Sequence, residues 1–201
     1  MRKNKKRLTR TLRKSYSIIG DGYTEKWYFE LMKQHEHLPR IDLKPELPRK
    51  QNLRNLFNQA IDNAKDYDKV FLLFDFDTII NNNQIEKFKR YLRKIARINK
   101  IIVLINNPCL EFWFLLHFEK TSKYFSHCSG VESELKKKGR IESYQKTEKF
   151  FKYSQKDIYA LLKPLQNNAI QNASRLGDFD IDKLQSPKAE IYKIIEFLLK
   201  N

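Results

Sequence analysis

Two carboxylates with a spacing suited to metal chemistry directly follow the apolar run Val70 to Phe74. They are Asp75 and Asp77, one residue apart. A continuous apolar run of this length is typical of a strand covered on both faces in a parallel sheet. Side chains alternate along a strand, so the sequence predicts that both carboxylates point to the same side. Two like charges in that position repel each other unless water screens them or a cation lies between them.

A third carboxylate, Asp21, follows the predicted strand 15–19 inside a Gly-Asp-Gly turn. In open parallel sheets, functional sites form beyond the carboxyl ends of the strands. If the two strands are neighbours, Asp21, Asp75 and Asp77 converge there. Oxygen-only clusters suit Mg²⁺ or Mn²⁺, which can polarise a phosphate and activate a water molecule. The alternative is a solvated turn, where Asp is common; we favour the metal site.

Alternating strand and helix signals indicate how these carboxylates are held. Apolar or alternating runs predict strands at 15–19, 40–44, 70–74 and 101–105. Apolar residues at helical spacing follow each strand. In the last unit, Asn107 suits the N-cap and Pro108 the first helical position. Four consecutive strand–helix units predict an α/β fold with a parallel sheet.

The strand signals stop near Phe118, and the predicted domain organisation follows from that change. Helical patterns continue from there to the C-terminus. We predict a basic N-terminal arm at 1–14, an α/β domain at 15–118 and a helical extension at 119–201 that packs on the same domain. Trp27 and Trp113 are expected to be core aromatics.

The charge of the chain is strongly unbalanced. Its 201 residues include 40 Lys and Arg against 24 Asp and Glu, a formal net charge of +16. The first 14 residues hold eight basic residues and no acid. Such an excess favours contact with a polyanion, above all nucleic acid. The candidate phosphate-binding residues are Arg2, Lys3, Lys5, Lys6, Arg7, Arg10, Arg13, Lys14 and Lys146.

Several classes of protein are disfavoured by the composition. No apolar run is long enough to cross a bilayer, and the basic N-terminus lacks the apolar segment of a secretory signal. Cys109 and Cys128 are too few for a disulfide framework or a cysteine-rich zinc site, so Cys109 is expected to be a buried thiol. A cytoplasmic protein without membrane contact is predicted.

Three blocks of sequence carry a family resemblance. "GDGYTEKWYF", "FLLFDFDT" and "NNPCLEFWFLLHF" occur in this order, and the chain resembles the RloB-like branch of the Toprim superfamily. That branch resembles an abortive-infection component encoded beside an ATPase. The C-terminal segments "YQKT", "NNAIQNASRL" and "SPKAEIYKIIEFLL" are also similar to elements of the family. The resemblance covers nearly the whole chain.

The resemblance implies a fold and an activity. The fold would be a Toprim-like α/β domain, with a four-stranded, mainly parallel sheet flanked by helices and a helical C-terminal cap. The activity would be that of a nuclease dependent on Mg²⁺ or Mn²⁺, acting on DNA or RNA, with tRNA as one possible substrate. The protein would be the effector of an anti-phage system together with a partner ATPase.

The resemblance also implies roles for individual residues. The acid after the first strand is usually Glu in the Toprim superfamily, where it is the general acid or base; here it is Asp21, one methylene shorter. Either the metal lies closer, or Glu25 shares the role, or activity is weakened. The implied catalytic set is Asp21, Glu25, Asp75 and Asp77. The implied metal ligands are Asp21, Asp75 and Asp77, and the supporting residues are Asn107 and Glu111.

Two other functions remain open. "LLFDFDTI" and "GDFDID" resemble motifs of haloacid-dehalogenase-type phosphatases, with Asp75 as nucleophile, Asp77 as acid and Asp178 and Asp182 as Mg²⁺ ligands. However, that opening motif normally lies on the first strand of the fold. A non-catalytic subunit that binds nucleic acid or an ATPase is the other alternative, and the Asp at position 21 in place of Glu favours it.

Overall fold

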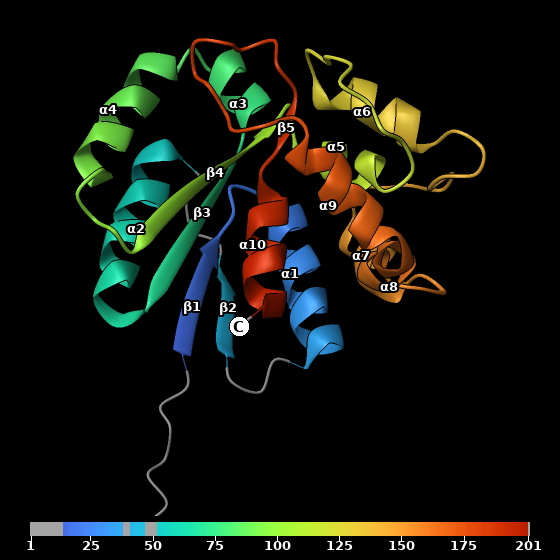
Figure 1. Cartoon of the computed structure of the whole chain (residues 1–201), viewed down its shortest axis with the longest axis horizontal. Coiled ribbons are helices and arrows are strands. Elements are labelled where there is room, and N and C mark those ends of the chain that lie inside the picture. The colour runs from blue at the N-terminus through green and yellow to red at the C-terminus, as the bar shows by residue number, and fades with distance from the viewer. Residues whose placement is uncertain (1–13, 38–40, 47–51, 201) are drawn as a thin grey trace, which may run out of the picture.

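The computed structural model describes residues 14–37, 41–46 and 52–200, with the backbone alone for 41–46. The predicted basic arm therefore lies outside the described residues, except for Lys14. A single five-stranded sheet has the order β2–β1–β3–β4–β5 (Figure 1). The strands are β1 (Lys14–Ile19), β2 (Ile41–Glu46), β3 (Lys69–Asp75), β4 (Ile101–Asn107) and β5 (Lys188–Ala189). The first four strands are parallel, as predicted, and the two-residue β5 adds an antiparallel edge.

Helices cover both faces of the sheet and form the C-terminal part of the chain (Figure 1). The first five are α1 (Tyr23–Glu36), α2 (Leu53–Asp66), α3 (Phe76–Asn81), α4 (Ile85–Ile95) and α5 (Leu110–Leu116). The others are α6 (Cys128–Leu135), α7 (Glu148–Tyr153), α8 (Ile158–Leu162), the 3₁₀ helix η1 (Lys163–Leu165), α9 (Gln166–Ser174) and α10 (Ile191–Lys200). The predicted α/β class is confirmed.

The buried run of β3 divides its side chains between two cores, because successive residues of a strand face opposite ways. Val70, Leu72 and Phe74 face α2, α3 and α4. Phe71 and Leu73 face the side of the sheet that holds α1, α5 and α10. Each of these side chains is at most 2% exposed, and burial of each stabilises the fold by roughly 1.5–3 kcal/mol. The apolar run is thus a strand covered on both faces.

The C-terminal helices share a core with the α/β part of the chain. Tyr28 of α1 packs against Phe114 of α5 and Tyr159 of α8, with ring centroids 5.5 Å apart in both pairs. Trp113 is fully buried and its Nε1 donates a hydrogen bond to the hydroxyl of Tyr28 at 3.1 Å. The expectation that Trp113 is a core aromatic is therefore confirmed.

The start of α5 differs from the sequence prediction in two respects. The Asn107–Pro108 peptide bond is cis, and the N-cap residue is Cys109, so the helix begins at Leu110 and not at Pro108. Cys109 is no free thiol, because it forms a disulfide with Cys128 at the start of α6, with their Cα atoms 5.7 Å apart. The segment 119–127 brings the two cysteines together, and spacing along the chain gave no sign of that approach.

In the part of the chain that the structure describes, no helix is both long enough and apolar enough to cross a bilayer.

Candidate metal centre

The turn between β1 and α1 folds closely over the side chain of Glu25. A Cβ atom added at Gly20 would lie 2.6 Å from Cβ of Glu25, and one added at Gly22 would lie 2.9 Å from its Oε2. Both distances are too short for a side chain without movement of Glu25. The two glycines therefore allow Glu25, in the first turn of α1, to lie directly beneath the loop that carries Asp21.

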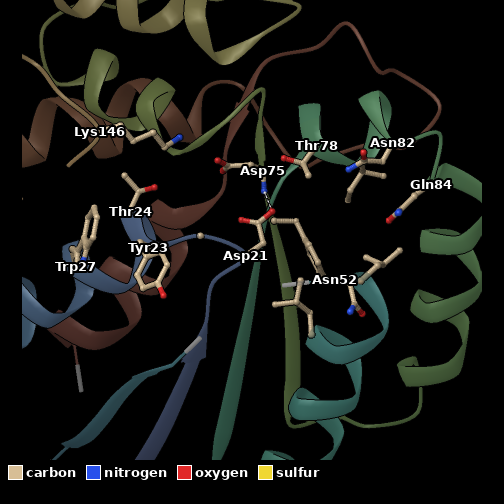
Figure 2. Close-up of a pocket in the computed structure, with 15 residues that line it drawn as sticks. Asp21, Tyr23, Thr24, Trp27, Asn52, Asp75, Thr78, Asn82, Gln84 and Lys146 are labelled. Carbon is tan, nitrogen blue, oxygen red and sulfur yellow. Dashed lines mark hydrogen bonds between the residues drawn. The ribbon is translucent and has the colours of Figure 1, made fainter. Parts of the chain in front are cut away.

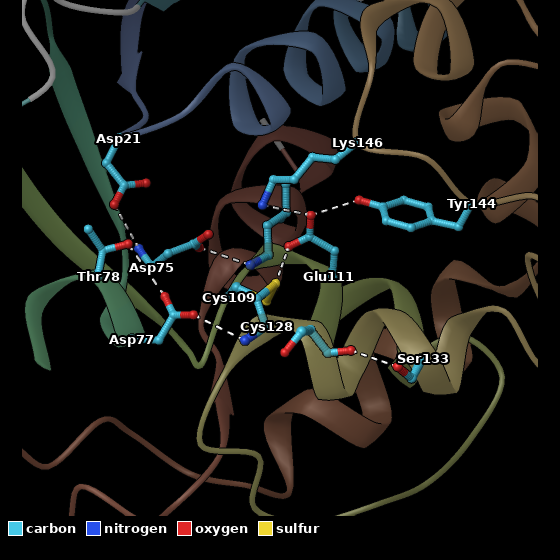
Figure 3. The surroundings of a disulfide bond; sticks show 12 residues. Asp21, Asp75, Asp77, Thr78, Cys109, Glu111, Cys128, Ser133, Tyr144 and Lys146 are labelled. Carbon is cyan, nitrogen blue, oxygen red and sulfur yellow. Dashed lines mark hydrogen bonds and ion pairs between the residues drawn. A yellow bond between two sulfur atoms is a disulfide. The ribbon is translucent and has the colours of Figure 1, made fainter. Parts of the chain in front are cut away.

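Asp75 connects three segments at the carboxyl end of the sheet. It is the last residue of β3, which lies next to β1. Its N–H donates a hydrogen bond to Oδ2 of Asp21 at 3.2 Å, and its Oδ1 accepts one from the N–H of Leu110 at 2.9 Å (Figure 3). The first turn of α5 and the loop after β1 are thus held against the end of β3.

These segments bring three carboxylates into one group. Asp21, Glu25 and Asp75 each offer an oxygen, and these oxygens all lie within 4.8 Å of one another. Mg²⁺ binds oxygen at about 2.0–2.1 Å, which places neighbouring and opposite ligands about 3 to 4 Å apart. A small shift of side chains would satisfy that geometry. The convergence of Asp21 and Asp75 agrees with the sequence prediction, and Glu25 joins them.

Burial and mutual repulsion disfavour the charged form of each acid in this group. Burial, followed by the charge of Glu25, raises the pKa of Asp21 well above its usual value. Burial, followed by the charges of Glu25 and Asp21, does the same for the pKa of Asp75. Burial raises the pKa of Glu25 to about 7, although the N–H groups of Gly22 and Glu25 oppose that rise.

The two oxygens of Glu25 are a further sign of a missing partner. Both are buried, and neither accepts a hydrogen bond of good geometry from a described residue. A buried carboxylate without a partner is costly, since its desolvation is not offset. A divalent cation shared with Asp21 and Asp75 would supply both the ligand bond and the counter-charge, so these residues fit a metal.

Asp77 is placed differently from the sequence prediction. Helix α3 begins at Phe76, so Asp77 lies in its first turn, and the alternation of a strand does not apply to it. Its Oδ2 accepts a hydrogen bond from the N–H of Cys128 at 3.1 Å (Figure 3). It is not a member of the group of carboxylates that lie within 4.8 Å of one another. Asp77 thus faces the start of α6, beside the group.

Glu111 holds a cation at the edge of the carboxylate group. Its Oε1 accepts a hydrogen bond from the hydroxyl of Tyr144 at 2.7 Å and forms an ion pair with Nζ of Lys146 at 3.0 Å (Figure 3). Burial opposes the charge of Lys146, but the charges of Glu111 and Asp75 outweigh that effect and raise its pKa. Burial still raises the pKa of Asp21, and the charge of Lys146 only opposes that rise. Lys146 is therefore a permanent cation beside the acids.

The disulfide lies directly behind this arrangement. Leu110, whose N–H binds Asp75, follows Cys109 in the chain, and Cys128 itself donates its N–H to Asp77. The bond between the two cysteines thus joins the two segments that hold these aspartates. The Sγ atom of Cys128 lies 2.9 Å from Oε2 of Glu111. A disulfide sulfur carries no hydrogen, so this is a close contact and not a hydrogen bond.

Asn107, expected as a supporting residue of the site, makes a structural contact at the end of β4. Its side-chain amide donates hydrogen bonds to the carbonyl oxygens of Leu184 and Ser186, both at 2.8 Å. It therefore fastens the segment before β5 to the end of β4. The preceding residue, Asn106, is paired with Asp75 in the sheet register, and its buried amide has no hydrogen-bond partner among the described residues.

A cleft of about 510 Å³ opens beside the carboxylates (Figure 2). Asp21, Asp75 and Lys146 belong to its lining. Trp27 packs against the core, as expected, and also lines the cleft. Residues that sequence reasoning did not single out also line the cleft; they include Tyr23, Thr24, Asn52, Thr78, Asn82 and Gln84. Tyr23, Thr24 and Thr78 lie within the blocks that carry the family resemblance, which assigned them no role. Asn52, Asn82 and Gln84 are cap residues of α2, α3 and α4, and no motif marks them.

Helix α4 presents a run of positive charge to solvent, which we call the basic face of α4. It consists of Lys87, Arg90, Arg93 and Lys94 of the helix and of Arg97 just after it, all exposed. None of the five forms an ion pair with a carboxylate that the structure describes, whereas Lys89 pairs with Glu86 and Asp182 at 3.6 Å. The helix starts next to Gln84, which lines the cleft.

The acids required by a haloacid-dehalogenase-type site do not gather here. Asp178 is exposed and pairs with Lys193 at 2.8 Å, and Asp182 is exposed near Lys89. Neither belongs to a group of potential metal ligands within the described residues. The geometry therefore gives no support to the phosphatase alternative.

Comparison with known proteins identifies the family. A family model described as RloB-like protein matches residues 16–198, which is nearly the whole chain. This match confirms the resemblance seen in the sequence. No curated protein and no solved structure matches the chain.

Proposed function

Since the chain belongs to the RloB-like family, we propose that it is a metal-dependent nuclease that cleaves phosphodiester bonds of nucleic acid. The observation that carries this proposal is the approach of Asp21, Glu25 and Asp75 within 4.8 Å at the carboxyl end of a parallel sheet. Oxygen ligands of this kind suit Mg²⁺ or Mn²⁺. When bound, such a metal polarises the phosphate and lowers the pKa of a water molecule.

The side chains around the group suggest a division of roles. Asp21 and Asp75 would hold the metal. Glu25, in the same group, would add an oxygen to the metal and transfer a proton as general acid or base. Lys146, fixed by Glu111, would bind a phosphate oxygen and stabilise its charge. Because Asp21 is one methylene shorter than the usual Glu, the position of Glu25 in the same group supports the idea that these two acids share the task.

The charge distribution supports nucleic acid as the substrate. The basic face of α4 offers positive charge that no described carboxylate neutralises, on a helix that begins at the cleft. The eight basic residues of the N-terminal 14 add to it. Lys and Arg that contact phosphates release counterions from nucleic acid, so binding should weaken steeply with salt. The family resemblance further suggests a role in an anti-phage system with a partner ATPase.

The test is cleavage of plasmid DNA, single-stranded DNA and total tRNA in Mg²⁺, Mn²⁺ or EDTA, with and without the partner ATPase. We expect metal-dependent cleavage of at least one substrate and none in EDTA. Asp75→Asn should abolish cleavage because it removes an anionic ligand. Asp178→Asn is the matched control, since this aspartate is exposed and away from the group. Equal activity of both variants would contradict the proposal.

A non-catalytic subunit is the second candidate function. The shorter acid at position 21, together with Asp77 turned to the N–H of Cys128, favours it. In that case the protein would bind nucleic acid or the ATPase, and Asp75→Asn would leave phage restriction in cells unchanged.

A further inference from the structure

We propose that the cleft beside the carboxylates holds one unstacked nucleotide, so that the substrate is a single-stranded or looped segment of nucleic acid. This inference rests on the proposed function for the identity of the ligand. It is carried by what lines the cleft on either side of Asp21 and Asp75: aromatic rings on one side and carboxamide side chains on the other (Figure 2).

The aromatic side is formed by two stacked rings. Tyr23 is 54% exposed, which is unusual for a large side chain in this chain, and its ring lies 5.6 Å from that of Trp27 at an interplanar angle of 29°. Trp27 is itself supported from behind by Phe151, at 5.5 Å between centroids. The Tyr23 ring is thus held from one side while its surface remains accessible in the cleft. Bases of single strands stack on such rings, because every base has a flat π-face.

The opposite side offers hydrogen-bonding groups that no described residue uses. The side chains of Asn82 and Gln84 line the cleft and form no hydrogen bond with the described part of the chain. Oδ1 of Asn52 accepts a bond from the N–H of Asn55 at 3.0 Å as the cap of α2, which leaves its NH₂ group available. Carboxamides donate and accept at once, as the exposed edges of unpaired bases require.

Size and position agree with a nucleotide. The volume of about 510 Å³ falls within the roughly 300–1,000 Å³ of pockets that hold small organic ligands. Lys146 and the carboxylates line the same cleft, so a base on Tyr23 would have its phosphate close to the proposed metal centre. A base inside a duplex is stacked and paired, and taking it out costs a few kcal/mol. The cleft therefore favours a strand whose bases are already free.

The test compares Tyr23→Leu with Tyr153→Leu. Tyr153 is a matched control because it is 74% exposed on α7 and does not line the cleft. Binding of a fluorescent single-stranded oligonucleotide, and of the same sequence in a blunt duplex, is measured in EDTA so that no cleavage occurs. Stacking of a base on an aromatic ring is worth about 1–3 kcal/mol, so Tyr23→Leu should weaken single-strand binding roughly 5- to 150-fold. Tyr23→Phe keeps the ring and should bind as the wild type does.

The duplex should bind equally well to all four proteins, and Tyr153→Leu should match the wild type on both ligands. Unchanged single-strand binding by Tyr23→Leu, or an equal loss on strand and duplex, would overturn the inference. Cleavage assays separate it from the proposed function. If Asp75→Asn abolishes cleavage while Tyr23→Leu binds normally, the nuclease stands and the nucleotide site fails. If no protein cleaves but Tyr23→Leu loses only the single strand, the nucleotide site stands without the catalysis.

Discussion

The backbone N–H of Asp75 donates a hydrogen bond to Oδ2 of Asp21 at 3.2 Å. The contact links the ends of two neighbouring parallel strands, because Asp75 closes β3 and Asp21 follows β1. It leaves the carboxylate of Asp75 free to turn toward Glu25 and toward the N–H of Leu110. This hydrogen bond therefore fixes the distance between two proposed metal ligands. Substitution of either aspartate should weaken metal binding at the same site.

Glu25 should matter more for metal binding than Asp77. Glu25 belongs to the group of oxygens within 4.8 Å, whereas Asp77 accepts a hydrogen bond from Cys128. We expect Glu25→Gln to abolish the rise in melting temperature that Mg²⁺ produces, and Asp77→Asn only to reduce it. Cleavage by Glu25→Gln should fall by about 100- to 10,000-fold, as for loss of a general acid or base. A Mg²⁺ effect that survives in Glu25→Gln and vanishes in Asp77→Asn would reverse this assignment.

Stability without metal should decrease as the pH rises from about 4.5 to 7. Burial raises the pKa of Glu25 from 4.5 to about 7, so the folded state binds the proton more tightly than the unfolded state does. The contribution of this proton to the free energy of unfolding is complete below the pKa of Glu25 in the unfolded state. It is lost as the pH rises through the pKa of Glu25 in the folded state. Through Glu25, the free energy of unfolding can change by at most about 3 kcal/mol over this pH range. Melting curves in EDTA from pH 4.5 to 8 measure the effect.

Glu25→Gln is the control for that pH dependence, since Gln does not titrate. Its melting temperature should vary less with pH than that of the wild type over this range. Mg²⁺ competes with protons for the same oxygens, so its stabilising effect on the wild type should grow with pH. A wild-type protein whose metal-free stability rises with pH, relative to the variant, would show that the fold favours the charged form of Glu25 and lowers its pKa, which contradicts the prediction.

The convergence of Asp21 and Asp75 could be predicted from the sequence for a simple physical reason. The apolar run before Asp75 has the length of a buried strand, and parallel strands present their carboxyl ends at one edge. The position of Asp77 could not be predicted in this way. The chain turns into α3 at Phe76, whose buried ring packs 4.6 Å from that of Phe179. That partner lies about a hundred residues further on, and no local periodicity reveals it.

Other features of the site depend on the same kind of distant contact. Asn107 has the sequence context of a helix cap, yet its amide binds the carbonyl oxygens of Leu184 and Ser186. The partner of Cys109 is likewise fixed by tertiary packing. A local signal was present for Tyr23, because a Tyr four residues before Trp27 has its ring on the same face once the helix includes both residues. Its exposure beside the cleft is what the structure adds.

The basic face of α4 should supply a salt-sensitive part of the affinity for nucleic acid. Lys87→Gln, Arg90→Gln and Lys94→Gln together remove three exposed charges from this face. If each contacts one phosphate, the slope of log affinity against log salt should fall by about 2 to 3. The melting temperature should stay close to that of the wild type, since the three side chains point into solvent. Fluorescence anisotropy at several salt concentrations gives the slope.

A matched control removes the same number of charges elsewhere. Lys120→Gln, Lys136→Gln and Lys138→Gln change exposed residues beyond α5 and α6 that form no ion pair with a described carboxylate. Net charge is then equal in the two triple variants. If both lose the same amount of affinity, only the overall charge matters and the basic face of α4 is no binding surface.

The disulfide between Cys109 and Cys128 should stabilise both the fold and the metal centre. It closes a loop with a sequence separation of 19, and closure of a loop of that size is worth about 3 kcal/mol. It also joins the residue before Leu110 to the residue that binds Asp77, so its loss should loosen both aspartates. The double variant Cys109→Ser and Cys128→Ser should melt at a lower temperature and show a smaller Mg²⁺ effect.

Dithiothreitol should reproduce both changes in the wild type and leave the variant unaffected. The cytoplasm keeps most thiols reduced, so in the predicted cytoplasmic location Cys109 and Cys128 would be free thiols. A wild-type protein that melts identically with and without dithiothreitol, and that gives two free thiols on titration after unfolding, would show that the aspartates are held by their backbone hydrogen bonds and not by this link.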